Sequence, residues 1–105
     1  MRRFVAIMIL VVAGYAQSAS AWDGSVTLIP TQIDVANAGN AAFRVITPSP
    51  ACTGGPNWAY LEPTDSNYNA YVAMIALAKT QGTSVILYNT IGPNNWCHIG
   101  YITAY

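Results

Sequence analysis

The sequence predicts one small, mainly β domain with a single helix, in the order β-β-β-α-β-β. The chain has 105 residues, which is enough for one hydrophobic core. Short apolar or alternating runs are separated by proline and glycine, as is typical of strands and turns. One stretch, residues 67–81, contains neither residue type and is long enough for a helix. Together these observations favour a compact β domain over a helical bundle.

The first 21 residues have the three-part form of a secretory signal. Arg2 and Arg3 precede an apolar run over residues 4–16, and small residues follow it up to Ala21. The apolar run is shorter than the roughly 20 residues that a membrane span needs. We therefore expect cleavage after Ala21, no stable membrane span, and a secreted or periplasmic domain of residues 22–105.

Charge is scarce in the whole chain and in the expected mature domain. Apolar residues make up 53% of the sequence and charged residues 8%. Loss of the signal would remove Arg2 and Arg3, leaving two basic against four acidic residues. Two basic residues are too few to bind the phosphate backbone of a nucleic acid. We therefore expect no nucleic-acid partner. Neutral polar and aromatic residues instead suit a surface that contacts polar neutral ligands or other copies of the chain.

Five strands are expected around the helix. Residues 26–35 form the first, with Pro30 either bending it or marking an edge. The second, residues 42–46, alternates about Arg44, and Pro63 ends the third. The remaining ranges are 58–62 for the third strand, 84–88 for the fourth and 98–105 for the fifth.

The helix has predicted ends and a predicted buried face. Thr64, Asp65 and Ser66 offer N-cap side chains, and Gly82 stands where a left-handed C-cap belongs. At 100° per residue one face holds Tyr68, Tyr71, Val72, Ile75 and Ala78. The outer side either meets water or packs on a neighbouring subunit, so its candidate interface residues are Ala73, Met74, Ala76 and Leu77.

The two cysteines, Cys52 and Cys97, are predicted to form a disulfide, because both lie in the exported part of the chain. A bridge over this separation would stabilise the fold by about 4 kcal/mol in the chain-entropy model. The alternatives are a redox-active pair or a bond between chains.

The predicted element order matches the five-stranded oligomer-binding barrel (OB-fold), in which a helix between the third and fourth strands closes one end. The second half of the chain adds motifs: a Cys loop, Trp58-x-Tyr60, Pro63-x-Asp65-x-x-Tyr68, Ala70, Leu77-Ala78, Gln81-Gly82-x-x-Val85-x-Leu87-Tyr88, and a second cysteine. In these positions the chain resembles small secreted bacterial proteins related to the B subunit of subtilase cytotoxin.

The resemblance implies an OB-fold, assembly into a homo-oligomeric ring of five subunits, and a surface that binds glycans. It also implies a partner A subunit that would carry any catalysis. The residues around the first strand differ from those of the toxin subunit, so its sugar-contacting residues are not carried over to positions here.

No catalytic or metal site is expected. A nucleophile pair of Cys97 and His98 would need a free thiol, which the predicted disulfide removes. The carboxylates stand in turns or at strand ends, and Asp65 is expected to cap the helix. No zinc, calcium or phosphate-loop spacing occurs, so neither metal nor cofactor is predicted.

Aromatic residues provide the candidate binding site. Sugar C–H faces stack on aromatic rings while their hydroxyls bond to amides and carboxylates. Trp96 follows Asn94 and Asn95 in a turn, where its ring either forms a ligand platform or packs over the disulfide. Tyr88 completes the candidate ligand-binding set, whereas Trp58 is expected in the core.

These observations predict a secreted, non-catalytic binding module that recognises glycans or a surface and assembles with itself. The alternative is a structural or interaction protein of the periplasm or cell exterior, which self-associates or binds a protein partner without glycan recognition.

Overall fold

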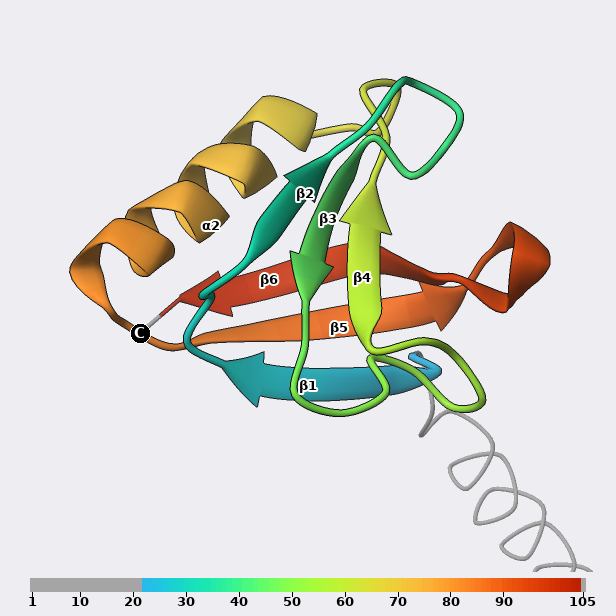
Figure 1. Ribbon diagram of the computed structural model, residues 1–105, viewed down its shortest axis with the longest axis horizontal. Coiled ribbons are helices and arrows are strands. Elements are labelled where there is room, and N and C mark those ends of the chain that lie inside the picture. The colour runs from blue at the N-terminus through green and yellow to red at the C-terminus, as the bar shows by residue number, and fades with distance from the viewer. Residues whose placement is uncertain (1–21, 105) are drawn as a thin grey trace, which may run out of the picture.

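The computed structural model describes residues 22–104, which form a six-stranded mixed sheet and one long helix (Figure 1). The strands follow one another across the sheet in the order β1-β5-β6-β4-β3-β2. All neighbours are antiparallel except β4 and β6, which run parallel. The elements are β1 (Gly24–Leu28), β2 (Ile33–Val35), β3 (Phe43–Ile46), β4 (Trp58–Leu61), α2 (Tyr68–Gln81), β5 (Val85–Ile91), the 3-10 turn η1 (Pro93–Asn95) and β6 (Cys97–Ala104).

The sheet consists of two halves that cross at a steep angle and enclose the core (Figure 1). One half holds β1, β5 and β6 and the other holds β2, β3 and β4. Apolar residues on the inner faces of both halves form a single buried cluster, to which α2 contributes Ile75 and Ala78. The halves are joined by the β4–β6 pairing, in which Tyr60 lies opposite His98. The β4–β6 pairing covers only a short part of the two strands. Because β6 pairs with both β4 and β5, the outer faces of the three strands are adjacent at this junction.

The predicted mainly β class with one helix is confirmed, but the predicted strand count and order are wrong. The expected first strand, residues 26–35, is two strands that lie at opposite edges of the sheet. Pro30 is buried between them and supplies no backbone N–H to a ladder, so the chain leaves β5 and later joins β3. The order is therefore β-β-β-β-α-β-β, and the sheet of the described residues is open, with β1 and β2 as edges instead of a closed five-stranded barrel.

The structure confirms the predicted buried face and the predicted C-terminus of the helix, but not the predicted N-cap. Ile75 and Ala78 are buried, and Tyr68, Tyr71, Val72 and Met74 pack against the core. Gly82 ends the helix with φ of 68°, a left-handed conformation that glycine adopts without a Cβ clash. At the other end the cap is Asn67, which makes no side-chain cap bond. The prediction that Asp65 caps the helix is wrong, because its carboxylate has other partners, described below.

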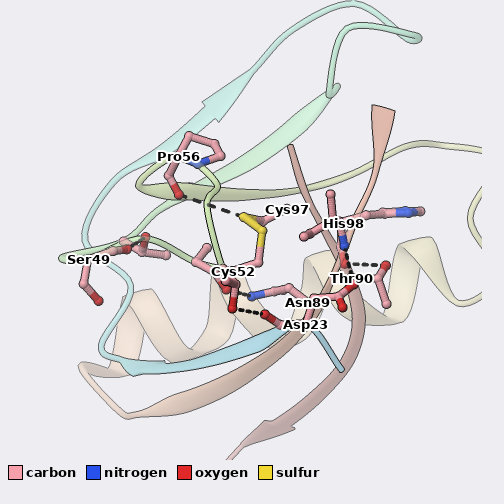
Figure 2. The surroundings of a disulfide bond; sticks show 12 residues. Asp23, Ser49, Cys52, Pro56, Asn89, Thr90, Cys97 and His98 are labelled. Carbon is pink, nitrogen blue, oxygen red and sulfur yellow. Dashed lines mark hydrogen bonds between the residues drawn. A yellow bond between two sulfur atoms is a disulfide. The ribbon is translucent and has the colours of Figure 1, made fainter. Parts of the chain in front are cut away.

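Cys52 and Cys97 form the predicted disulfide, which joins the loop before β4 to the first residue of β6 (Figure 2). Gly55 permits this packing, since a Cβ there would lie 2.4 Å from the Sγ of Cys97. A disulfide is consistent with an oxidising, extracytoplasmic location. The predicted signal segment, residues 1–21, lies outside the described residues. Within residues 22–104 no helix is long and apolar enough to cross a membrane.

Candidate functional site

Strand register places a set of polar and aromatic side chains on the outer face of the sheet. On β6, Cys97 and Ile99 are buried, whereas His98 between them is only partly covered. His98 lies opposite Thr90 on β5 and opposite Tyr60 on β4. Because successive residues of a strand alternate between faces, these three side chains share the outer face.

The first aromatic group on this face is the Trp22 cluster, defined as Trp22, Tyr88 and Tyr101. Its ring centroids are 6.1 Å apart for Trp22 and Tyr88, 6.4 Å for Trp22 and Tyr101, and 5.4 Å for the two tyrosines. Trp22 is 39% exposed and Tyr101 is 51% exposed. The cluster therefore presents accessible ring surface at the β5–β6 pair.

Gly100 sets the position of the Trp22 ring. The register between β5 and β6 shifts at Tyr88 and Asn89, which leaves Gly100 unpaired as a bulge beside Tyr101. A Cβ on Gly100 would lie 2.4 Å from Cζ3 of Trp22. The absent side chain thus allows the indole ring to lie directly against the backbone of β6.

The second aromatic group is the Trp96 cluster, defined as Trp58, Tyr60, Trp96 and His98. The Trp58 and Trp96 rings are 5.2 Å apart, and Tyr60 stacks on His98 at 4.7 Å and 13°. Arg44 lies over Trp58 at 4.8 Å, a cation–π contact. Its guanidinium also donates to the carbonyl oxygens of Ala41 at 3.1 Å and Asn40 at 2.7 Å, so the guanidinium is held within the fold.

Asp65 and His98 form the principal polar pair of the outer face. Asp65 Oδ2 accepts hydrogen bonds from His98 Nε2 at 2.7 Å and from the Glu62 N–H at 2.9 Å. The Asp65 side chain is 18% exposed and that of His98 is 33% exposed. Both bonds that the Asp65 carboxylate accepts from the described residues end on Oδ2. The other oxygen, Oδ1, is therefore left to accept from a ligand.

A cavity of about 200 Å³ lies at this pair, and we call it the Asp65 pocket. His98 connects it to the Trp96 cluster, and Gly100, beneath Trp22, connects it to the Trp22 cluster. Tyr71 reaches it from α2 and donates through its hydroxyl to the Gly100 carbonyl at 3.2 Å. Its lining residues are Asp65, Ser66, Tyr71, Thr90, His98, Ile99 and Gly100.

Burial and nearby negative charge raise the pKa of Tyr60, which lies next to this pocket. Tyr60 is 5% exposed, and this burial raises the pKa of its phenol above the usual value of 10.0. The carboxylates of Glu62 and then Asp65 raise this pKa further, because they disfavour a second negative charge nearby. Tyr60 is thus a neutral hydroxyl at physiological pH.

The Asp65–His98 pair has no nucleophile bonded to it among the described residues. The Asp65–His98 pair would need a nucleophile bonded to the imidazole, yet no hydroxyl of the described residues donates to that ring. Cys97 is held in the disulfide. Among residues 22–104 no group of three or more histidine, cysteine, aspartate or glutamate residues could hold a metal ion. What remains is a polar pocket flanked by rings.

The predicted ligand residues lie in two different places. Tyr88 belongs to the Trp22 cluster and Trp96 to the Trp96 cluster, in which it is half-buried against Trp58. Asn94 and Asn95 are exposed in the turn η1, with φ of 63° and 60°. The expectation that Trp58 is a core residue is wrong: it is half-buried on the outer face, because its register partner Ile46 also points there.

The candidate interface on α2 is partly open to solvent in the single chain. Ala73, Ala76 and Leu77 are exposed, Leu77 by 56%, while Met74 is half-buried against the core. Met74 is therefore committed to the fold, and the exposed stretch is centred on Leu77.

Sequence analysis missed the combination of Asp65, His98 and Trp22. The apolar residues Cys97 and Ile99 on either side of His98 already indicate that its side chain lies on the outer surface of the strand. No local pattern could have paired it with Asp65, which is 33 positions earlier in the chain.

Comparisons of the chain with protein-family models, with curated proteins and with solved structures find no match.

Proposed function

We propose that the mature chain is a secreted, non-catalytic module that binds saccharides on the outer face of β5 and β6. The observation that carries this proposal is the Asp65 pocket beside the exposed rings of Trp22 and Tyr101. A sugar needs an aromatic surface for its C–H face and polar groups for its hydroxyls, and both are adjacent here. The sequence resemblance to toxin B subunits points to the same function.

The pocket supports recognition of one sugar residue rather than of a large ligand. Its volume of about 200 Å³ is below the range of roughly 300–1,000 Å³ that is usual for drug-sized ligands. The lining is polar and carries hydroxyls from Ser66, Tyr71 and Thr90. A longer glycan would therefore place one residue in the pocket and extend over the neighbouring rings.

The test is a glycan array probed with the mature protein, followed by titration of the best ligand. We expect Tyr101→Ala and Trp22→Ala each to weaken binding by about tenfold, the loss typical of a stacked ring at a binding site. Val35→Ala is the control, because Val35 is 78% exposed on β2 at the opposite edge of the sheet. Wild-type protein that binds no glycan on the array would contradict the proposal.

A second function, self-association, is favoured by the exposure of Leu77. Leu77 is 56% exposed, and the small residues Ala73 and Ala76 next to it on α2 are also exposed, which gives the helix an apolar outer side. In the proposed assembly this side packs on a neighbouring subunit in a ring of five, to which a separate catalytic subunit could attach.

Native mass spectrometry of the mature protein tests the assembly. We expect a mass five times that of the mature chain for the wild-type protein. Leu77→Glu should abolish this five-chain assembly, whereas Val35→Glu should leave it intact. A monomeric mass at all protein concentrations would contradict self-association and would leave the saccharide proposal standing.

A further inference from the structure

We propose that the Asp65 pocket selects a neutral, hydroxyl-bearing sugar residue and rejects one that carries a carboxylate or sulfate. This inference rests on the proposed saccharide function and adds the charge class of the ligand. It is carried by the free acceptor of Asp65, by the absence of Lys and Arg from the pocket lining, and by the ring beside the pocket.

The pocket offers a free hydrogen-bond acceptor, Oδ1 of Asp65. The Asp65 side chain is largely covered, and both hydrogen bonds of its carboxylate to described residues use Oδ2, which leaves Oδ1 for a ligand. An ionised carboxylate can accept hydrogen bonds but cannot donate them. The ligand group at Oδ1 must therefore be a donor, and a sugar hydroxyl is one. A carboxylate or sulfate would bring a second acceptor and a second negative charge.

The charges around the pocket leave an anion without a counter-charge. No Lys or Arg is among its lining residues. Arg44 lies over Trp58 and donates to two backbone carbonyls, and Lys79 is in the last turn of α2, far along the helix from Asp65. The Nε2 of His98 is bonded to Asp65 at 2.7 Å and is therefore engaged within the protein.

A second carboxylate adds to the negative field on this side of the molecule. Glu62 accepts from the backbone N–H groups of Gly39, Ala41 and Ala42, which fixes it at the end of β4. Like charges separated by a few ångströms repel strongly where water is partly excluded. An anionic sugar in the pocket would meet Asp65 directly, while Glu62 lies outside the lining and adds only its longer-range charge.

The ring beside the pocket fixes how a neutral sugar would lie. Gly100 lines the pocket and is also in contact range of the Trp22 indole. A hydroxyl that donates to Asp65 Oδ1 therefore belongs to a sugar whose C–H face can lie on Trp22. Ser66 and Thr90 line the same cavity and can each offer a hydroxyl oxygen to a second sugar hydroxyl, the Thr90 hydroxyl donating its own proton to the His98 carbonyl at 3.5 Å.

The experiment compares matched glycans that differ only in charge. A neutral oligosaccharide, its sialylated form and its sulfated form are titrated into the mature protein by calorimetry. We expect the neutral form to bind at least tenfold more tightly than either anionic form. Equal or tighter binding of the sialylated or sulfated form would overturn the inference while leaving the saccharide function intact. If none of the three forms binds and no glycan on the array binds, the proposed function itself is contradicted.

Variants assign the selectivity to Asp65. In Asp65→Asn, which keeps the size and removes the charge, we expect neutral binding to weaken about tenfold and the preference over anionic forms to fall below threefold. Asp34→Asn is the matched control: Asp34 is an exposed carboxylate on β2, so its loss changes net charge equally and should leave the preference unchanged. An equal loss of preference in both variants would overturn the assignment.

A second variant guards against misfolding of Asp65→Asn, because Asp65 also accepts from the Glu62 backbone. Thr90→Val removes a pocket hydroxyl at constant volume and retains the charge. We expect it to weaken neutral binding about threefold and to keep the preference. If Thr90→Val, with its thermal unfolding unchanged, binds the neutral glycan as wild type does, the ligand does not occupy the pocket and the inference fails.

Discussion

At the scale of single residues, Asn89 is a polar side chain buried in the interior. It is fully buried on β5, and its side-chain Nδ2 donates to the Ala51 carbonyl at 2.7 Å (Figure 2). Its Oδ1 has no hydrogen-bond partner among residues 22–104, so Asn89 already carries a desolvation cost. Its Nδ2 in turn satisfies a buried carbonyl in the loop that also carries Cys52.

Asn89→Ala should lower the free energy of unfolding by about 1–3 kcal/mol, because the Ala51 carbonyl would stay buried without a donor. Urea denaturation followed by tryptophan fluorescence measures the change. Asn69→Ala serves as the control, since Asn69 is exposed on α2, and should shift stability by less than about 0.5 kcal/mol. A near-neutral Asn89→Ala would show that the carbonyl finds another partner.

Tyr60 should make stability sensitive to alkaline pH. Its pKa in the fold is raised above the usual 10.0, first by burial and then by Glu62 and Asp65. The unfolded chain therefore loses the phenolic proton at a lower pH than the folded one. The stabilising contribution is complete below about pH 10 and is lost as pH rises from that value through the raised pKa.

Thermal unfolding between pH 8 and 12 checks this expectation, together with absorbance titration of the phenols. Tyr60→Phe should flatten the fall in melting temperature above about pH 10, because it removes the group that titrates. A fall of the same steepness in Tyr60→Phe would mean that other groups cause it.

At the scale of elements, the helix is defined more strongly at its C-terminus than at its N-terminus. Gly82 has φ of 68°, and its N–H bonds to the Ala78 carbonyl. Nothing lies within 4 Å of a Cβ placed there, so a substitution meets backbone strain and no steric clash. At the other end, Asn67 begins the helix without a side-chain bond.

Gly82→Ala should therefore cost about 1 kcal/mol, the penalty of a left-handed alanine. Gly82→Asn should cost less, because asparagine tolerates this conformation better. Chemical denaturation of both variants measures the difference. Equal stability of Gly82→Ala and wild type would indicate that the chain can leave the helix by another route.

The strands show where sequence patterns succeed and where they do not. β5 and β6 were expected from their apolar runs and are present, each extended toward the turn η1. The division of residues 26–35 was not expected, because a proline can either bend a strand or end it. That choice depends on which partner strand is nearby, which local sequence does not encode.

At the scale of the whole molecule, the disulfide lies at the junction of the two sheet halves. Cys97 opens β6 and is the register partner of Ala59 on β4, while Cys52 lies in the loop that leads to β4. The bond thus connects the β1-β5-β6 half to the segment that feeds the other half, across 45 residues of chain.

Replacing both cysteines, Cys52→Ala and Cys97→Ala together, should lower the free energy of unfolding by about 4 kcal/mol, with a range of roughly 2–5. Urea denaturation of the double variant, beside wild-type protein with and without reductant, gives the comparison. If the variant loses less than about 1 kcal/mol, the unfolded chain must already hold the two loops together.

The sequence by itself determined the mainly β class, the helix and its buried face, the Gly82 cap and the cysteine pair, because each depends on local periodicity, backbone preference or simple count. Only the tertiary structure decided the separation of β1 from β2, the pairing of Asp65 with His98, and the placement of Trp22 against Gly100. The physical reason is that these contacts join residues far apart in the chain. Their geometry follows from how the two sheet halves cross, so the saccharide proposal depends on a surface that no single segment contains.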